Sequence, residues 1–225
     1  MQRAKTLSMR RDICHGDGEM PSSGQKKAAN TGIKTFFMKG LVKLLRKPQA
    51  KISLEKLEGS VLDIGAGGEG VIAKTCGKET VCVDIRRREI QEAKTRGAVA
   101  NWVLCDACFM PFREAAFDAA AFFFSLMYIK TSERKQAAIS EARRVLGSGG
   151  CLYMWDANVW EKPELYMVFV EAKLPDGEMI YTGYGVRGKR EKEQTLELVS
   201  RLALEAGFKA DKTEAHKNWF AARFQ

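Results

Sequence analysis

The ten residues VLDIGAGGEG, at positions 61–70, decide how the rest of this sequence is interpreted. An apolar run ends at Asp63, and glycines follow at positions 65, 67, 68 and 70. The spacing Gly65-x-Gly67-x-x-Gly70 is typical of a turn where a strand ends, a helix begins and backbone N–H groups bind a cofactor phosphate. The stretch therefore predicts a cofactor-binding turn, and the residues around it must indicate which cofactor it takes.

Strands and helices alternate along the chain around this turn. Helices are expected directly after Gly70, at 86–97 and at 132–147. This alternation predicts a parallel sheet with helices on both faces. The first, second and fourth strands are apolar almost throughout, as expected of parallel strands that are buried on both faces. The five expected strands are SVLDIG (60–65), TVCVDI (80–85), ANWVLCDA (100–107), FDAAAFFFSL (117–126) and GCLYMWDA (150–157).

The pattern changes after residue 157. Residues 165–186, within an insertion at about 160–188, are predicted to form two strands joined by a turn at Asp176-Gly177, a dipeptide typical of β-hairpins. If the turn has two residues, Phe169 lies opposite Tyr184 on a face that would cover the acceptor side of the site. A helix at about 190–206 and one or two strands in 208–225 complete the chain.

The N-terminal segment carries most of the net charge of +9. Residues 1–50 contain 11 Lys and Arg against 3 Asp and Glu, whereas residues 51–225 contain 26 against 25. Residues 1–30 are polar and are expected to be a flexible tail. Residues 31–50 are expected to hold an amphipathic helix that ends at Pro48, and residues 51–225 the main domain. The near-neutral domain argues against a broad nucleic-acid-binding face on it.

Composition excludes several classes of protein. The chain is 45% hydrophobic and 29% charged, as in ordinary soluble proteins, and no apolar run reaches the roughly 18 residues of a membrane span. The first 20 residues lack the apolar core of a signal peptide, so we expect a cytoplasmic protein with reduced cysteines. Cys105 and Cys108 have metal-ligand spacing, but no second pair or nearby histidine follows them, so no metal site is expected.

Three acidic residues bear on the cofactor. A carboxylate at Asp63 would oppose the charges of a dinucleotide pyrophosphate but would tolerate the cationic sulfonium and ammonium groups of S-adenosylmethionine (SAM). Asp84 ends the second strand and can accept hydrogen bonds from the ribose of either cofactor. Asp106 ends the third strand and can accept from an adenine amino group, while the N–H of Ala107 donates to a ring nitrogen. Asp63 and Asp106 therefore favour SAM.

Five segments, in this order, resemble a class I SAM-dependent methyltransferase: VLDIGAGGEG, VCVDI, LCDACFMPF, FDAAAFFFSLMYI and EARRVLGSGGCLYM. The resemblance covers residues 59–157, under half of the chain. It implies an α/β, Rossmann-like fold with seven mostly parallel strands in the order 3-2-1-4-5-7-6 and helices on both faces. To this fold we expect an N-terminal amphipathic helix and the hairpin after strand five to be added. SAM would bind at the carboxyl ends of strands one to four.

By position, the resemblance implies two groups of SAM-binding residues. Those at the methionine part would be Asp63, Gly65, Ala66, Gly67, Phe124 and Ser125. Those at the ribose and adenine would be Asp84, Ile85, Asp106 and Ala107. The usual Gly-x-Gly-x-Gly turn of the family is altered, because Glu69 occupies its third glycine position. Glu69 either points at the SAM amino group or is a solvated loop residue.

The resemblance implies the reaction but not the acceptor, because SAM carries its own leaving group and the protein mainly aligns and desolvates the reactants. The segment FSLMY at 124–128 lacks the Pro-Pro-aromatic motif of adenine methylation in nucleic acids, and no Pro-Cys motif supports cytosine C5 chemistry. Asp156, at the end of strand five, is the best general-base candidate, although it could equally cap a helix or turn. Tyr128 is the second catalytic candidate, and the expected substrate-binding residues are Trp155, Tyr181 and Tyr184.

A small-molecule acceptor is favoured, and two alternatives stay open. One is an RNA or protein acceptor held by the basic N-terminal segment. The other is a non-catalytic module that binds SAM or NAD. The basic helix could also contact a membrane surface, or cover the SAM site with its lysines in water. The sequence does not indicate an oligomeric state.

Overall fold

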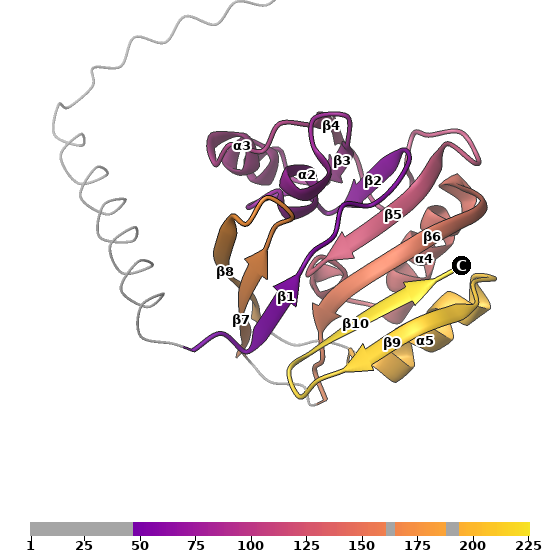
Figure 1. Cartoon of the computed structure of the whole chain (residues 1–225). Coiled ribbons are helices and arrows are strands. Elements are labelled where there is room, and N and C mark those ends of the chain that lie inside the picture. Colours follow the sequence, from indigo (N-terminus) through magenta and orange to yellow (C-terminus); the bar gives the residue numbers. More distant parts are fainter. Residues whose placement is uncertain (1–46, 161–164, 188–193) are drawn as a thin grey trace, which may run out of the picture. The chain divides into compact units, whose positions relative to one another are not determined.

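The computed structural model describes residues 47–160, 165–187 and 194–225, and the predicted tail and most of the predicted N-terminal helix lie outside this part (Figure 1). Its larger sheet has seven strands in the order β4-β3-β2-β5-β6-β10-β9. Counted from β2, this is the predicted order 3-2-1-4-5-7-6, with β10 antiparallel to both of its neighbours. The strands are β2 (Val61–Ile64), β3 (Val81–Asp84), β4 (Asn101–Leu104), β5 (Phe117–Phe123), β6 (Leu146–Ala157), β9 (Ala210–Ala215) and β10 (Trp219–Phe224).

Both faces of the central strands are covered, which explains their continuous apolar runs. Along β5, Ala120 and Phe122 face one core with helices α4 and α5, which lie behind the sheet in Figure 1. Ala121 and Phe123 face a second core on the opposite side, with α2. The alternation follows from the two-residue period of a strand. The helices are α2 (Val71–Cys76), α3 (Arg87–Thr95), α4 (Ser132–Val145) and α5 (Leu196–Glu205), and η1 (Leu126–Tyr128) is a short 3-10 helix.

A second sheet, in the order β1-β7-β8, consists of β1 (Ala50–Ser53), β7 (Leu165–Lys173) and β8 (Met179–Arg187). Strand β1 runs parallel to β7 and was not predicted: its first residue fell in the segment 31–50 expected to hold a helix, and residues 51–53 were assigned to no element. Ala50 and Ile52 are buried while Lys51 and Ser53 are exposed, which is the alternation of a strand. Four residues are too few for this pattern to stand out in the sequence.

The β7–β8 hairpin was predicted, but its register was wrong by one residue. Lys173 pairs with Met179, and the Leu174 N–H donates to the Glu178 carbonyl across 2.8 Å, so the loop consists of residues 175–177, three residues rather than two. Such a loop ends in a residue with positive φ, here Gly177 at +91°. The slip places Tyr184 opposite Val168 instead of Phe169 and moves its side chain to the buried face.

Two smaller expectations also need correction. Helix α4 ends at Val145 rather than 147, and β6 begins at Leu146, four residues before the predicted start of that strand. Among the described residues, no helix combines the length and the apolar character needed to cross a membrane.

Candidate functional site

The glycine turn joins β2 to α2 and packs closely against neighbouring strand ends. Gly65 has a φ of +77°, and its N–H donates to the Val83 carbonyl across 2.8 Å. A Cβ added at Gly65 would lie 2.5 Å from the Cβ of Ser125, and one added at Gly67 would lie 2.6 Å from Oδ2 of Asp84. These two positions therefore need glycine because of packing within the protein itself.

Asp84 ties the end of β3 to the turn. Its Oδ2 accepts a hydrogen bond from the Gly67 N–H across 3.1 Å, and its Oδ1 accepts one from the Arg86 N–H across 2.8 Å. A carboxylate has about four acceptor sites, so both oxygens can accept further bonds, such as those from ribose hydroxyls. Ile85, the next residue, is 60% exposed and leaves an apolar surface beside this carboxylate.

Asp63 is buried in the middle of the sheet, at the base of the turn. Burial, with a smaller contribution from the charge of Asp84, raises the pKa of its carboxyl to about 8. The carboxyl is therefore mostly protonated at pH 7, and a cation placed beside it would favour its ionised form. This chemistry fits the ammonium of SAM better than a pyrophosphate.

Asp106 begins the loop between β4 and β5. Its Oδ1 accepts from the Cys108 N–H across 2.9 Å, and its Oδ2 accepts from Arg134 Nη2 on α4 across 2.5 Å. Burial raises the pKa of this carboxyl, but the bonds from Cys108 and Arg134 outweigh it and hold the pKa below its usual value. Asp106 is thus an ionised acceptor next to Ala107. Phe109, which the sequence analysis did not single out, is 76% exposed in the same loop.

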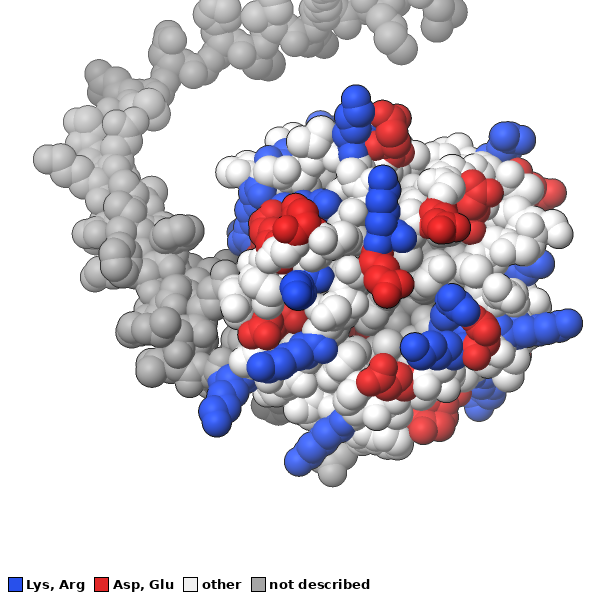
Figure 2. Space-filling model, viewed as in Figure 1, with Lys and Arg blue, Asp and Glu red and all other residues white. Residues whose placement is uncertain are grey.

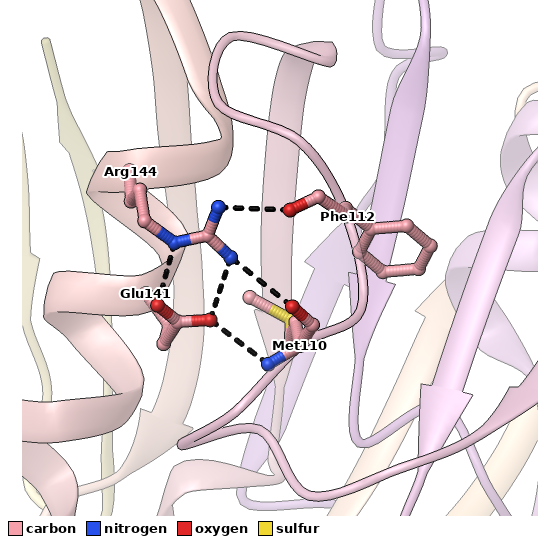
Figure 3. A network of polar contacts seen from close by, with 4 residues as sticks. All are labelled: Met110, Phe112, Glu141 and Arg144. Atoms are coloured by element: carbon pink, nitrogen blue, oxygen red, sulfur yellow. Dashed lines mark hydrogen bonds and ion pairs between the residues drawn. The ribbon is translucent and has the colours of Figure 1, made fainter.

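A second contact with α4 fixes the far part of this loop (Figure 3). Glu141 accepts the N–H of Met110 across 2.8 Å and also binds Arg144. Arg144 donates in turn to the carbonyls of Phe112, across 2.8 Å, and Met110, across 3.1 Å. Helix α4 therefore holds the loop at both ends, so the positions of Asp106 and Ala107 depend on a helix about 30 residues further along the chain.

The connection after β5 reaches across to β2. Phe124 has a φ of +49°, which is rare for a residue other than glycine, and its N–H donates to the Trp155 carbonyl across 2.7 Å. The Ser125 hydroxyl donates to the Ile64 carbonyl across 2.6 Å. A costly backbone conformation that is held by surrounding contacts is common at functional sites. The Phe124 side chain is fully buried, so only its backbone remains for a methionine contact.

Asp156 lies at the end of β6, and its carboxylate bonds to groups within the protein. It is fully buried, its Oδ2 accepts from the N–H groups of Leu126 (2.8 Å) and Met127 (3.3 Å), and its Oδ1 accepts from Gln194 Nε2 (2.8 Å). This is the capping role that the sequence left open, applied to the first residues of η1. Burial raises the pKa of Asp156 to about 6, partly offset by an N–H of Ala157 and the charge of Lys135.

The expected acceptor-binding aromatic residues fall into two groups. Tyr184 faces the core, where its ring stacks on that of Phe124 with the ring centroids 4.9 Å apart. Trp155 lies on the same side of the large sheet, with its ring centroid 5.9 Å from that of Phe123. Tyr181 is 43% exposed on the opposite face of the hairpin. Tyr181 and Tyr184 therefore cannot line one common site.

Tyr128 connects η1 to the hairpin. Its hydroxyl oxygen accepts the Gly185 N–H across 3.3 Å, and the guanidinium of Arg86 lies 5.8 Å from its ring centroid. Its side chain is 40% exposed. Of the two catalytic candidates, Tyr128 is thus the accessible one.

Glu69 is largely shielded from solvent and is not a freely solvated loop residue. Its carboxylate forms an ion pair with Arg96, which follows α3 and also binds Glu92. The pair joins the glycine turn to the end of α3. In the part of the chain that the structure describes, no group of three or more His, Cys, Asp or Glu residues could hold a metal ion.

Comparisons with known proteins agree with this geometry. Residues 62–154 match the model of a family described as "Methyltransferase domain". The chain is 34% identical over 104 residues to the human protein "Probable tRNA methyltransferase 9B" (45% of this chain, 22% of that one). It is also 34% identical over 127 residues to the "Ubiquinone/menaquinone biosynthesis C-methyltransferase UbiE" of Cupriavidus metallidurans (51% of each chain). The chain spans about half or less of the length of these relatives.

The fold is also that of a solved structure. A SAM-dependent methyltransferase from Methanosarcina mazei superposes with a TM-score of 0.54 at 17% identity, covering 82% of this chain and 96% of that one. Because it covers 82% of this chain, this similarity extends beyond residues 62–154, which the family model matches.

Proposed function

We propose that this chain transfers the methyl group of SAM to a small-molecule acceptor, a proposal supported by the methyltransferase-domain match of residues 62–154 and by the fold shared with a SAM-dependent methyltransferase. The observation that carries the proposal is the joining of three strand ends at the glycine turn. Gly67 binds Asp84 of β3, and Ser125, after β5, binds Ile64 of β2. Open α/β sheets bind ligands at the carboxyl ends of their strands, at the point where the strand order reverses, and here that point lies between β2 and β5.

The residues of the site would bind and align rather than exchange protons. SAM supplies an activated methyl group whose leaving group departs as a neutral thioether. Asp84 would hold the ribose, the Asp106–Ala107 segment the adenine, and Asp63 the ammonium. Burial raises the pKa of the Tyr128 phenol above its ordinary value, so Tyr128 is a neutral hydrogen-bonding group at pH 7. With Asp156 buried and capping η1, we propose no general base for the reaction.

The hairpin supports an acceptor of limited size. Tyr184 stacks on Phe124, and Gly185 bonds to Tyr128, so β8 is held directly against the connection that follows β5. A hairpin held there would limit the size of the acceptor and exclude water from the reaction. Figure 2 shows Lys and Arg groups interspersed with Asp and Glu groups on the visible face of the domain, without a large field of one sign. A long polyanion would need such a field.

An RNA acceptor is the second candidate. It is favoured by the 11 Lys and Arg residues among residues 1–50 and by the similarity to a protein described as a probable tRNA methyltransferase. Contacts from a basic segment to phosphates would make binding strongly salt-dependent.

Methyl transfer from radiolabelled SAM separates the two candidates. The full chain is incubated with the small-molecule fraction of a cell extract and, separately, with total RNA and with extract proteins. We expect label in an organic-soluble small product. Label that becomes acid-soluble after ribonuclease treatment would replace this proposal with the RNA candidate, and label in protein would replace it with a protein acceptor.

A further inference from the structure

Gln194 connects two buried charged residues from different elements. It is fully buried two residues before α5, where it forms an isolated β-bridge with Val159. Its Oε1 accepts a hydrogen bond from Lys135 Nζ of α4, and its Nε2 donates to Asp156 Oδ1 across 2.8 Å. Its backbone pairs with Val159 in both directions, at 2.6 and 3.0 Å. The residue is therefore fixed by α4 on one side and by the segment at the end of β6 on the other.

The amide of Gln194 has only one orientation that satisfies both neighbours. An ammonium group has donors only, and an ionised carboxylate has acceptors only. The carbonyl end must therefore face Lys135, and the NH₂ end must face Asp156. In this orientation the amide dipole links the positive and negative groups, which are too costly to bury without such partners.

Asp156 extends this link to the SAM site. Its second oxygen holds the N–H groups of Leu126 and Met127, the first residues of η1. Ser125, directly before η1, binds the end of β2, and Tyr128, at the end of η1, binds the hairpin. A shift of η1 would therefore move both contacts.

We propose that Gln194 is a positioning residue for the methyl-transfer site: it fixes the Asp156 carboxylate, and through it the η1 segment that places Ser125 and Tyr128. The expected effect on SAM binding rests on the proposed function, whereas the expected effect on the position of η1 does not. Gln194 itself touches neither SAM nor acceptor.

Gln194→Leu keeps most of the volume and removes both polar ends. The Asp156 carboxylate then loses a donor in a buried environment, which weakens its hold on η1. We expect the amides of Leu126 and Met127 to exchange with solvent about tenfold faster, and S-adenosylhomocysteine to bind about fivefold more weakly. The amide of Val83, in the neighbouring strand β3, should keep its exchange rate. Gln91→Leu, at an exposed position of α3, is the matched control and should change none of these values.

Gln194→Glu gives a second readout that a general loss of stability would not produce. The introduced carboxyl lies beside Asp156, so the two share a proton at low pH and repel each other once it is lost. The other titratable groups acting on Asp156 are Lys135 from α4, Tyr128 from η1 and Tyr166 from β7. The affinity of the Gln194→Glu variant for S-adenosylhomocysteine, relative to that of the wild type at the same pH, should therefore decrease as the pH rises from 6 to 8.

Two results would overturn the inference. One is a folded Gln194→Leu variant with unchanged exchange at Leu126 and Met127. The other is an equal increase in exchange at all core amides, which would indicate a role in overall stability only. If the wild type itself fails to bind S-adenosylhomocysteine, the proposed function is wrong, and the exchange rates still decide the role of Gln194.

Discussion

The two sides of the site are built in different ways. On the cofactor side, the ends of β2 and β3 are brought together by a β-α-β connection, and Gly67 binds Asp84 only 17 residues away. On the hairpin side, Tyr128 binds Gly185 57 residues away, and Gln194 binds Asp156 38 residues away. The first side follows from a local motif, whereas the second depends on tertiary contacts that no short motif specifies. Substitutions on the cofactor side should accordingly affect binding, and those on the hairpin side should affect binding and stability together.

The largest effect is expected at the turn. Gly67→Ala places a Cβ 2.3 Å from that of Glu89 and 2.6 Å from Asp84 Oδ2, so the turn must open. Overpacking of this kind costs ~3 kcal/mol, so S-adenosylhomocysteine should bind at least about 100-fold more weakly. Calorimetric titration measures this. Gly147→Ala is the control, because its Cβ would make only an ordinary 3.6 Å contact, and equal losses in both variants would contradict the packing argument.

The next effect concerns Asp84. In the wild type the two Asp84 oxygens accept bonds from the N–H groups of Gly67 and Arg86. In Asp84→Asn the side-chain amide nitrogen replaces one of these oxygens, so one hydrogen bond to a charged acceptor is lost. SAM affinity should fall by about 10- to 100-fold, the range for such bonds. The melting temperature is measured in parallel. Unchanged affinity for SAM would remove Asp84 from the ribose site.

Tyr184→Leu tests the hairpin side. The lost stacking on Phe124 should lower the free energy of unfolding by about 2 kcal/mol and the melting temperature by about 4–8 °C. Binding of S-adenosylhomocysteine should weaken with it. This outcome differs from the expectation for an acceptor-facing tyrosine, which would leave stability intact. Tyr181→Leu, on the exposed face of the same strand, serves as control and should melt near the wild-type temperature.

The smallest effect is a pH dependence on the cofactor side. The pKa of Asp63 is raised to about 8, so the carboxyl is protonated below that pH, and SAM should bind its ionised form better. Binding should release a proton, and affinity should rise about three- to tenfold between pH 6.5 and pH 8. Titrations in two buffers of different ionisation enthalpy measure the proton release. Asp63→Asn should abolish the contribution of Asp63 to the proton release and to the pH dependence of SAM affinity. If the variant keeps the full pH dependence, another group is responsible for it.

The sequence predicted most of the large sheet because its strands are apolar and separated by helices of clear period. It missed β1, whose four residues begin at the end of the segment expected to hold an amphipathic helix and are too few to show a clear pattern. It also placed the hairpin turn one residue short, because the dipeptide Asp176-Gly177 fits both a two-residue and a three-residue loop. Asp156 shows the limit for the site. A carboxyl that faces an acceptor and one that caps η1 look alike in sequence, since Leu126 and Met127 lie 30 and 29 residues away.

Strand β1 has a consequence for the order in which the protein assembles. The bond between the Phe169 N–H and the Gln49 side chain closes a loop of 120 residues, and the β1–β7 pairing spans the same distance. Closing so long a loop costs chain entropy that only an already folded intervening domain can reduce. The three-stranded sheet should therefore be completed last during folding, when β1 joins the local β7–β8 hairpin. Because β8 of this sheet holds Tyr184 against Phe124, the site should reach its final form only in that last step, even when the glycine turn is already in place.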